Sequence, residues 1–261
     1  MRTLNKQGYT IGRYRVRTMM RAAALVAVWK RKFVRTTKSK LTGRIAPNLL
    51  QQDFKVSKIN SVWVADITYI QTQSGWLYLA AEMDLYARKI VGWSLASQMR
   101  ASLVCCALNM AVTTRQPVAG LIAHTDQGGQ YASDDYLALL TKYQITASIS
   151  ARGNCYNNAV MERFFLNLKM ERVWQTHQAN NQKAVKDISQ YIVAFNNGTR
   201  LHSSLGYLSP KQFETKLTEK PIMSIESPIL VDQYKSIFIG IDSSQFLAGC
   251  ISFCHLAEYY A

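Results

Sequence analysis

Residues 62–70 read Val-Trp-Val-Ala-Asp-Ile-Thr-Tyr-Ile, and this stretch decides which fold the chain can adopt. β-Branched and aromatic residues dominate it, so Val62–Ile70 is predicted to be a strand. Two runs of the same kind, Leu77–Met83 and Lys89–Leu95, follow after the turn residues Ser74-Gly75 and Asp84–Arg88. Three short strands joined by two turns predict an antiparallel meander.

Beyond the meander, helical and strand patterns alternate along the chain. Helices are predicted at 102–114, 133–143, 156–173 and 181–196, and strands at 120–124 and 145–149. Strands first, and then strand and helix in alternation, predict an α/β fold: a mixed five-stranded sheet flanked by helices.

The first sixty residues are strongly basic, with fifteen Lys and Arg against a single acid, Asp53. Residues 61–220 hold fifteen bases and eleven acids, so the basic excess is local. Such a segment suggests a polyanionic partner, of which nucleic acid is the usual one; a solubilising tail is the alternative.

A helix is predicted from Tyr14 to Phe33 and a linker from Thr36 to Pro47. Basic side chains surround the apolar positions of this helix and are candidate DNA-phosphate contacts, although a merely solvated face has the same pattern. The candidates are Arg13, Arg15, Arg17, Arg21, Lys30, Arg31 and Lys32.

Three carboxylates stand in unusual places. Asp66 lies in the middle of an apolar strand, where burial without a compensating charge is costly. Asp126 directly follows the strand Leu121–His124, and Glu162 lies near the start of an apolar helix. Each has a structural explanation when taken alone: an arginine partner for Asp66, an Asx turn for Asp126 and the helix dipole for Glu162.

Taken together, the three acids predict a metal site at one edge of the sheet. Carboxylates that converge cannot all be ionised without cations between them, and oxygen ligands suit Mg²⁺, with Mn²⁺ as a substitute. Two such ions would clamp the attacking and leaving oxygens of a phosphoryl transfer. His124 could orient a ligand or be an ordinary strand-end histidine. Lys169, on the same helical stripe as Glu162, could contact a DNA phosphate or be a solvated lysine.

Five cysteines form no spaced framework, and no uncharged apolar run is long enough to span a membrane. We therefore expect a cytoplasmic protein with no membrane partner.

Six motifs closely resemble the integrase core of insertion-sequence transposases of the IS-three type, in the polypeptide of the second reading frame, OrfB. They are WVADITY (63–69), GWLYL (75–79), DLYARKIVGW (84–93), HTDQGGQY (124–131), GNCYNNA (153–159) and RLHSSLGYLSP (200–210). The similarity extends from about Arg13 to Glu214.

This resemblance implies an RNase H-like fold and a DDE triad formed by Asp66, Asp126 and Glu162, with thirty-five residues between the last two. It implies metal-dependent cleavage and joining of DNA at the ends of the element, and DNA contacts at Lys169 and Arg200. The alternatives are a nuclease on the same fold and a non-catalytic DNA-binding remnant of a decayed element. The resemblance further implies that the protein forms a homo-oligomer on DNA and is joined to an upstream-frame protein, OrfA, by frameshift fusion or by association. The expected location is the bacterial cytoplasm, in association with the nucleoid.

Three departures from the family pattern give expectations about the domains. Asn157 stands where relatives have Asp, and fewer residues precede Arg13 than in relatives, so we expect an incomplete DNA-binding unit. We expect a basic, partly helix-turn-helix-like region at 1–57, the catalytic core at 58–218 and a tail of unknown role at 219–261.

Overall fold

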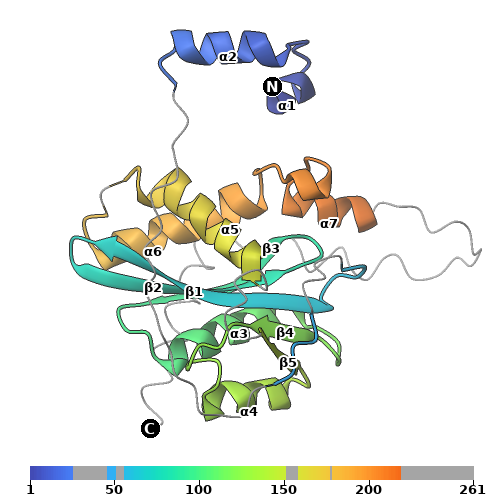
Figure 1. Ribbon diagram of the computed structural model, residues 1–261, viewed down its shortest axis with the longest axis vertical. Helices are drawn as coiled ribbons and strands as arrows, with labels where there is room; N and C mark the ends of the chain where they lie inside the picture. Colours follow the sequence, from blue (N-terminus) through green and yellow to red (C-terminus); the bar gives the residue numbers. More distant parts are fainter. Residues whose placement is uncertain (26–45, 51–55, 151–157, 177, 219–261) are drawn as a thin grey trace, which may run out of the picture. The chain divides into compact units, whose positions relative to one another are not determined.

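The computed structural model describes residues 1–25, 46–50, 56–150, 158–176 and 178–218. One sheet of five strands lies at its centre, in the spatial order β3-β2-β1-β4-β5 (Figure 1). The strands are β1 (Val62–Thr72), β2 (Gly75–Asp84), β3 (Lys89–Ala96), β4 (Ile122–Thr125) and β5 (Thr146–Ile149). The first three strands are antiparallel, and β4 and β5 run parallel to β1, so the predicted meander and mixed sheet are confirmed.

Helices cover both faces of the sheet. They are α3 (Ala101–Arg115), α4 (Asp134–Lys142), α5 (Ala159–Leu168), α6 (Asn181–Gln190) and α7 (Pro210–Thr218). Val64 and Ile70 of β1 pack in one apolar cluster with residues of α5 and α6, whereas Trp63 and Ala65 pack in another with α3 and α4. Figure 1 shows α5 and α6 on one side of β1 and β2, with α3 and α4 on the other. Because successive side chains of a strand point to opposite faces of the sheet, β1 contributes to both apolar clusters.

Close packing of α3 on the sheet depends on Gly92 in β3. A Cβ atom at this position would lie 2.3 Å from the carbonyl oxygen of Ala107 and 2.7 Å from the Cβ of Ala111. Both neighbours belong to α3, and one of the two clashes is with its backbone. Only glycine therefore allows α3 to approach β3 this closely.

Strand β1 extends well beyond its neighbour β4. Only Val62 to Val64 pair with β4, whereas pairing with β2 continues to Thr72. Among the described residues, none forms a strand beside the second half of β1 on its β4 side. Asn158, immediately before α5, covers part of this edge, because its Nδ2 donates a hydrogen bond to the carbonyl oxygen of Ala65 over 3.1 Å. The helix that carries Glu162 is thereby fixed next to the strand that carries Asp66.

Some helices differ from the sequence-based expectation. The first basic helix is α2 (Arg13–Ala22), preceded by the short α1 (Arg2–Lys6); the predicted continuation beyond residue 25 lies outside the described residues. The helices predicted to end at 173 and 196 finish in π-helical turns, η2 (Lys169–Val173) and η3 (Tyr191–Asn197). Such wide turns are rare, and hydrophobic spacing alone does not reveal them.

Helix α7 was not predicted, although its signal is present in the sequence. Ser209 Oγ accepts the N–H of Gln212, and Gln212 Oε1 accepts the N–H of Ser209, which is a reciprocal capping box. Pro210 occupies the first helical position, where its missing N–H costs nothing. The four residues Ser-Pro-Lys-Gln therefore predict the start of this helix.

Among the described helices, none is both long enough and apolar enough to cross a membrane.

Candidate active site

Asp66 is the innermost of the three predicted acids. It lies on the α5 side of β1 and is half-buried, and its Oδ1 accepts the N–H of Ile67 over 2.7 Å. Burial raises the pKa of this carboxyl well above its usual value, and the charges of Asp126 and Glu162 raise it further. Lys169 acts in the opposite direction. The three acids and this lysine, which come from β1, the loop after β4, α5 and η2, are therefore close enough to influence one another electrostatically.

Asp126 is exposed and directly follows β4. Its Oδ1 accepts the N–H of Gly128 over 2.9 Å, so the Asx turn proposed as its structural explanation is present. A Cβ atom on Gly128 would lie 2.9 Å from this oxygen, and glycine at 128 therefore leaves the carboxylate room to stay in place. Partial burial raises the pKa of Asp126, and the Gly128 hydrogen bond opposes this rise.

Glu162 lies in the first turn of α5 and is exposed. The residues around it, Met161, Phe164, Phe165 and Leu168, are buried and attach the helix to the sheet. Asparagine is a favoured N-cap residue, so the sequence predicts that Asn158 caps this helix. It stands at the N-cap position, but its side chain makes no capping hydrogen bond and instead binds β1. Residues 154–157, with Asn157, lie outside the described residues.

Lys169 follows α5 at the start of η2 and is half-buried. Its Nζ lies 4.6 Å from the centroid of the Tyr69 ring, a cation–π contact. Burial lowers the pKa of Lys169, and Asp66 raises it. The lysine is therefore held beside the acids by an aromatic ring, which is a more specific environment than that of a solvated lysine.

His124 is fully buried on β4, and its Nδ1 lies 2.9 Å from Ser148 Oγ on β5. This position corresponds to the alternative of a strand-end histidine with a hydrogen-bond partner.

Within the described part of the chain, no three His, Cys, Asp or Glu side chains are grouped closely enough to form a metal site as they stand. The chemistry of the donors nevertheless fits a divalent cation, because three carboxylates act on one another and their oxygens suit Mg²⁺ or Mn²⁺. A cation placed among them would remove the mutual repulsion that raises the pKa of Asp66.

Comparison with known proteins settles the family. An integrase core domain model matches residues 56–155, and a second integrase core domain model matches residues 143–210. Transposase InsF for insertion sequence IS3A, from Escherichia coli strain K12, is 41% identical over 213 residues, which cover 82% of this chain and 74% of that protein. The chain belongs to the IS3-type family of insertion-sequence transposases.

Two further similarities agree with this membership. The insertion element IS600 uncharacterized 31 kDa protein of Shigella sonnei is 41% identical over 213 residues, which cover 82% of this chain and 78% of that protein. A chain of the simian T-cell lymphotropic virus intasome in complex with PP2A regulatory subunit B56 gamma has a TM-score of 0.52 at 14% identity, covering 88% of this chain and 74% of that chain. The second likeness shows the RNase H-like fold of retroviral integrases. The protein is thus a DNA transposase with an integrase-like core.

The predicted DNA contacts of the transposase fall into three groups. Four arginines lie exposed on α2: Arg13, Arg15, Arg17 and Arg21. Lys30, Arg31 and Lys32 lie outside the described residues. Arg200 forms an ion pair with Glu171, which also accepts the hydroxyl of Tyr191 over 2.6 Å. Each of these residues stays a prediction as a DNA contact, and Arg200 already has a carboxylate partner.

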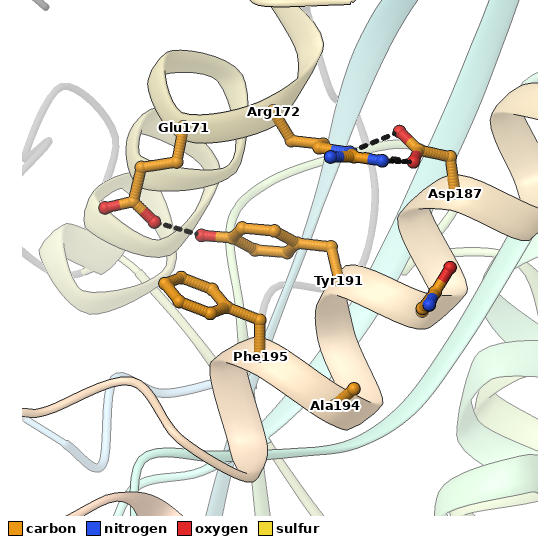
Figure 2. A pocket seen from close by; sticks show the side chains of 7 residues that line it. Glu171, Arg172, Asp187, Tyr191, Ala194 and Phe195 are labelled. Atoms are coloured by element: carbon orange, nitrogen blue, oxygen red, sulfur yellow. Dashed lines mark hydrogen bonds and ion pairs between the residues drawn. The ribbon is translucent and has the colours of Figure 1, made fainter.

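A surface cavity of about 360 Å³ lies beside this ion pair. It is lined by residues of η2, α6 and η3, and Figure 2 shows Tyr191 directed at Glu171 and Arg172 facing Asp187 across it. Arg172 and Asp187 are thus paired with each other, and Glu171 is paired with Tyr191 and Arg200. The cavity is not part of the acidic site.

Glu82 was not predicted as a notable residue. Like Asp66, it is a single acid inside an apolar run, and this pattern is visible in the sequence. Glu82 lies on β2 opposite Ala65 and is 1% exposed. Burial raises its pKa to about 8, and the hydroxyl of Tyr136 opposes this rise. In the transposase, Glu82 is therefore a buried acid that keeps its proton near neutral pH.

Proposed function

We propose that Asp66, Asp126 and Glu162 form the catalytic DDE triad of this transposase and hold divalent metal, most simply two Mg²⁺ ions for which Mn²⁺ can substitute. The observation that supports this most is the raised pKa of Asp66, to which both other acids contribute. A half-buried acid among like charges is unfavourable in the isolated protein and becomes favourable once cations are bound.

Bound metal would supply positive charge to the phosphodiester and to the attacking and leaving oxygens during cleavage and strand transfer. The remaining contribution of the chain is positional. The rigid strand β1 fixes Asp66, the Asx turn fixes Asp126, and the buried face of α5 fixes Glu162. Fixed carboxylates need no reorganisation during the reaction, and this is the main way in which a protein assists phosphoryl transfer.

DNA would be held by basic residues outside the triad. Lys169 would bind a phosphate next to the reacting one, because it is held near Asp66. The arginines of α2, with Lys30, Arg31 and Lys32, would bind the element end through phosphate contacts, and Arg200 would do so only after exchanging its carboxylate partner.

Assembly on DNA as a homo-oligomer, and association or fusion with an upstream-frame OrfA protein, belong to the same proposal. They rest on the family, because both ends of an element must be processed together. Because the substrate is DNA, the protein would be associated with the nucleoid in the bacterial cytoplasm.

Strand cleavage and strand transfer with element-end DNA test the triad. Asp126→Asn keeps the shape of the side chain and its acceptor for Gly128, and we expect it to lose at least ~10³-fold of both activities with Mg²⁺ or Mn²⁺. Asp134→Asn, an exposed acid in the first turn of α4, is the matched control and should retain activity. Full activity of Asp126→Asn would exclude the triad.

Metal binding provides a readout that does not depend on activity. A ligand that binds only the folded state raises its melting temperature, so Mg²⁺ or Mn²⁺ should stabilise the wild type and Asp134→Asn but not Asp126→Asn. A pre-cut DNA end with a free 3′-hydroxyl should be joined to target DNA, whereas a simple nuclease would only hydrolyse.

A further inference from the structure

The tip of the β1–β2 hairpin carries two exposed aromatic side chains. Tyr69 is 39% exposed and Trp76 is 48% exposed. Tyr69 is directly opposite Tyr78 in the register, so Trp76 is its diagonal neighbour on the same face. The two rings are 5.3 Å apart between centroids and are inclined at 83°, an edge-to-face pair. This is a specific arrangement of two large apolar groups in contact with solvent.

The other face of the same hairpin is fully covered. Ile70 and Leu77, which alternate with Tyr69 and Trp76, are only 1% and 2% exposed and belong to the core shared with α5 and α6. On the aromatic face, the neighbouring strands end early: β3 pairs with β2 only as far as Tyr78, and β4 pairs with β1 only as far as Val64. The hairpin is therefore anchored on one side and open on the side of Tyr69 and Trp76.

The aromatic pair is connected to the acidic site by Lys169. Its Nζ lies over the Tyr69 ring at 4.6 Å, and the same lysine and Asp66 shift each other's pKa. Along the strand, Tyr69 is three residues from Asp66, which corresponds to roughly 10 Å. Because the two positions differ by three residues, Tyr69 and Asp66 point to opposite faces of β1, and Lys169, which interacts with both, connects these two faces.

The geometry also determines which ring is available. In an edge-to-face pair, each ring keeps at least one face that its partner does not cover. Lys169 occupies a face of Tyr69, so Trp76 offers the more open ring face. Tyr69 then has a positioning role, because it touches both Trp76 and Lys169.

We propose that Trp76 stacks on an unpaired base of the DNA end held in the acidic site, while Lys169 binds the adjacent phosphate. The carboxylates repel DNA, so the attraction must come from neighbouring groups. An aromatic ring beside a cation is the combination that binds single-stranded nucleic acid without regard to sequence. The inference rests on the proposed function only for the place of the DNA end.

Binding of labelled DNA ends, measured in EDTA, tests this contact without requiring catalysis. Two probes of equal length are compared, a blunt duplex and a duplex with three unpaired nucleotides at one end. Trp76→Ala should weaken binding of the unpaired end about tenfold and leave the blunt duplex unchanged. Trp76→Phe should restore most of this loss and Trp76→Leu should not. Phe195→Ala, an exposed aromatic on η3, is the control and should change neither.

Three results would overturn the proposal. Equal weakening of both probes would mean that Trp76 does not recognise unpaired bases. Full binding by Trp76→Leu would mean that only apolar area matters. A loss of self-association in Trp76→Ala, seen by sedimentation with both probes bound normally, would assign the surface to a second copy of the chain. An inactive Asp126→Asn variant should still bind the unpaired end, so failure of this contact and failure of the triad are distinguishable.

Discussion

Two aspartates on neighbouring strands of the sheet, Asp66 on β1 and Asp84 at the end of β2, have opposite surroundings. Asp84 is fully buried, yet it accepts the N–H groups of Asn60 and Tyr86, each over 3.0 Å, and Arg115 lies 3.3 Å away. Asp66 has one backbone donor, its own neighbour Ile67, and two other acids close by. Burial raises the pKa of both carboxyls, but the partners of Asp84 oppose the rise, whereas two of the neighbours of Asp66 add to it.

This comparison separates an acid with hydrogen-bond partners inside the chain from the acid that we propose binds metal. Asp84 organises the turn after β2 and binds Arg115, which in turn binds Glu214 of α7 over 2.7 Å. Its hydrogen bonds are complete within the chain. Asp66 lacks a comparable set of donors, and its neighbours make the ionised form unfavourable until positive charge arrives from outside. Glu82 shows a third solution, in which the acid stays protonated.

The largest effect is expected for Asp66→Asn. Removing this charge should abolish strand cleavage, a loss of at least ~10³-fold, because the innermost carboxylate of the proposed triad is gone. Stability should not fall, since the amide relieves repulsion from Asp126 and Glu162. Cleavage assays and urea unfolding of the same preparation check both statements. A variant that unfolds more easily and keeps its activity would place Asp66 in the same class as Asp84.

Asp84→Ala should act on stability rather than on chemistry. Its removal leaves Arg115 with a single carboxylate and two half-buried N–H groups without their acceptor, so the free energy of unfolding should fall by about 3 kcal/mol. Equilibrium urea denaturation measures this loss. The double variant Asp84→Ala with Arg115→Met should recover part of it, because the under-compensated charge is removed as well. An unchanged midpoint for Asp84→Ala would show that the network contributes little.

The smallest effect is expected for Glu82 and appears as a pH dependence. The unfolded glutamate ionises near pH 4.5, whereas the folded one keeps its proton up to about pH 8. In between, the folded state holds one more proton, so rising pH removes stability. From pH 6 to pH 8 this group should cost about 2 kcal/mol of unfolding free energy.

Glu82→Gln should abolish that part of the pH dependence. Its nearest titratable neighbours, Tyr131 and Tyr136, stay neutral over this range because burial raises their pKa well above the usual value. Urea denaturation of wild type and variant at pH 6, 7 and 8 measures the difference. Parallel pH profiles for the two proteins would mean that Glu82 is already ionised in the folded state.

Much of the fold could be read from periodicity. All five strands lie within a few residues of their predicted ends, and the apolar stripe of α5 correctly predicts which of its residues are buried. These features depend on the spacing of side chains along one segment, which the sequence states directly. The π-helical turns and the short pairing of β4 with β1 were not predictable in this way, because they depend on contacts with other segments.

The candidate site shows the same division. An acid inside an apolar strand, another directly after a strand and a third at a helix start are visible as sequence anomalies, and the structure brings these three together. Asn158 looks like a helix cap in sequence but binds Ala65 instead, and Arg200 looks like a free cation but pairs with Glu171. A polar side chain takes the partner that the fold offers, and local sequence does not specify it.

The sequence by itself determined the strands, the helices and the identity of three acids that no ordinary core would tolerate. Only the tertiary structure decided that Asp84 is satisfied, that Glu82 keeps its proton, and that Lys169 stands between Tyr69 and Asp66. The reason is physical: the cost of burying a charge depends on the donors and charges within a few ångströms of it. Those neighbours come from segments far apart in the chain.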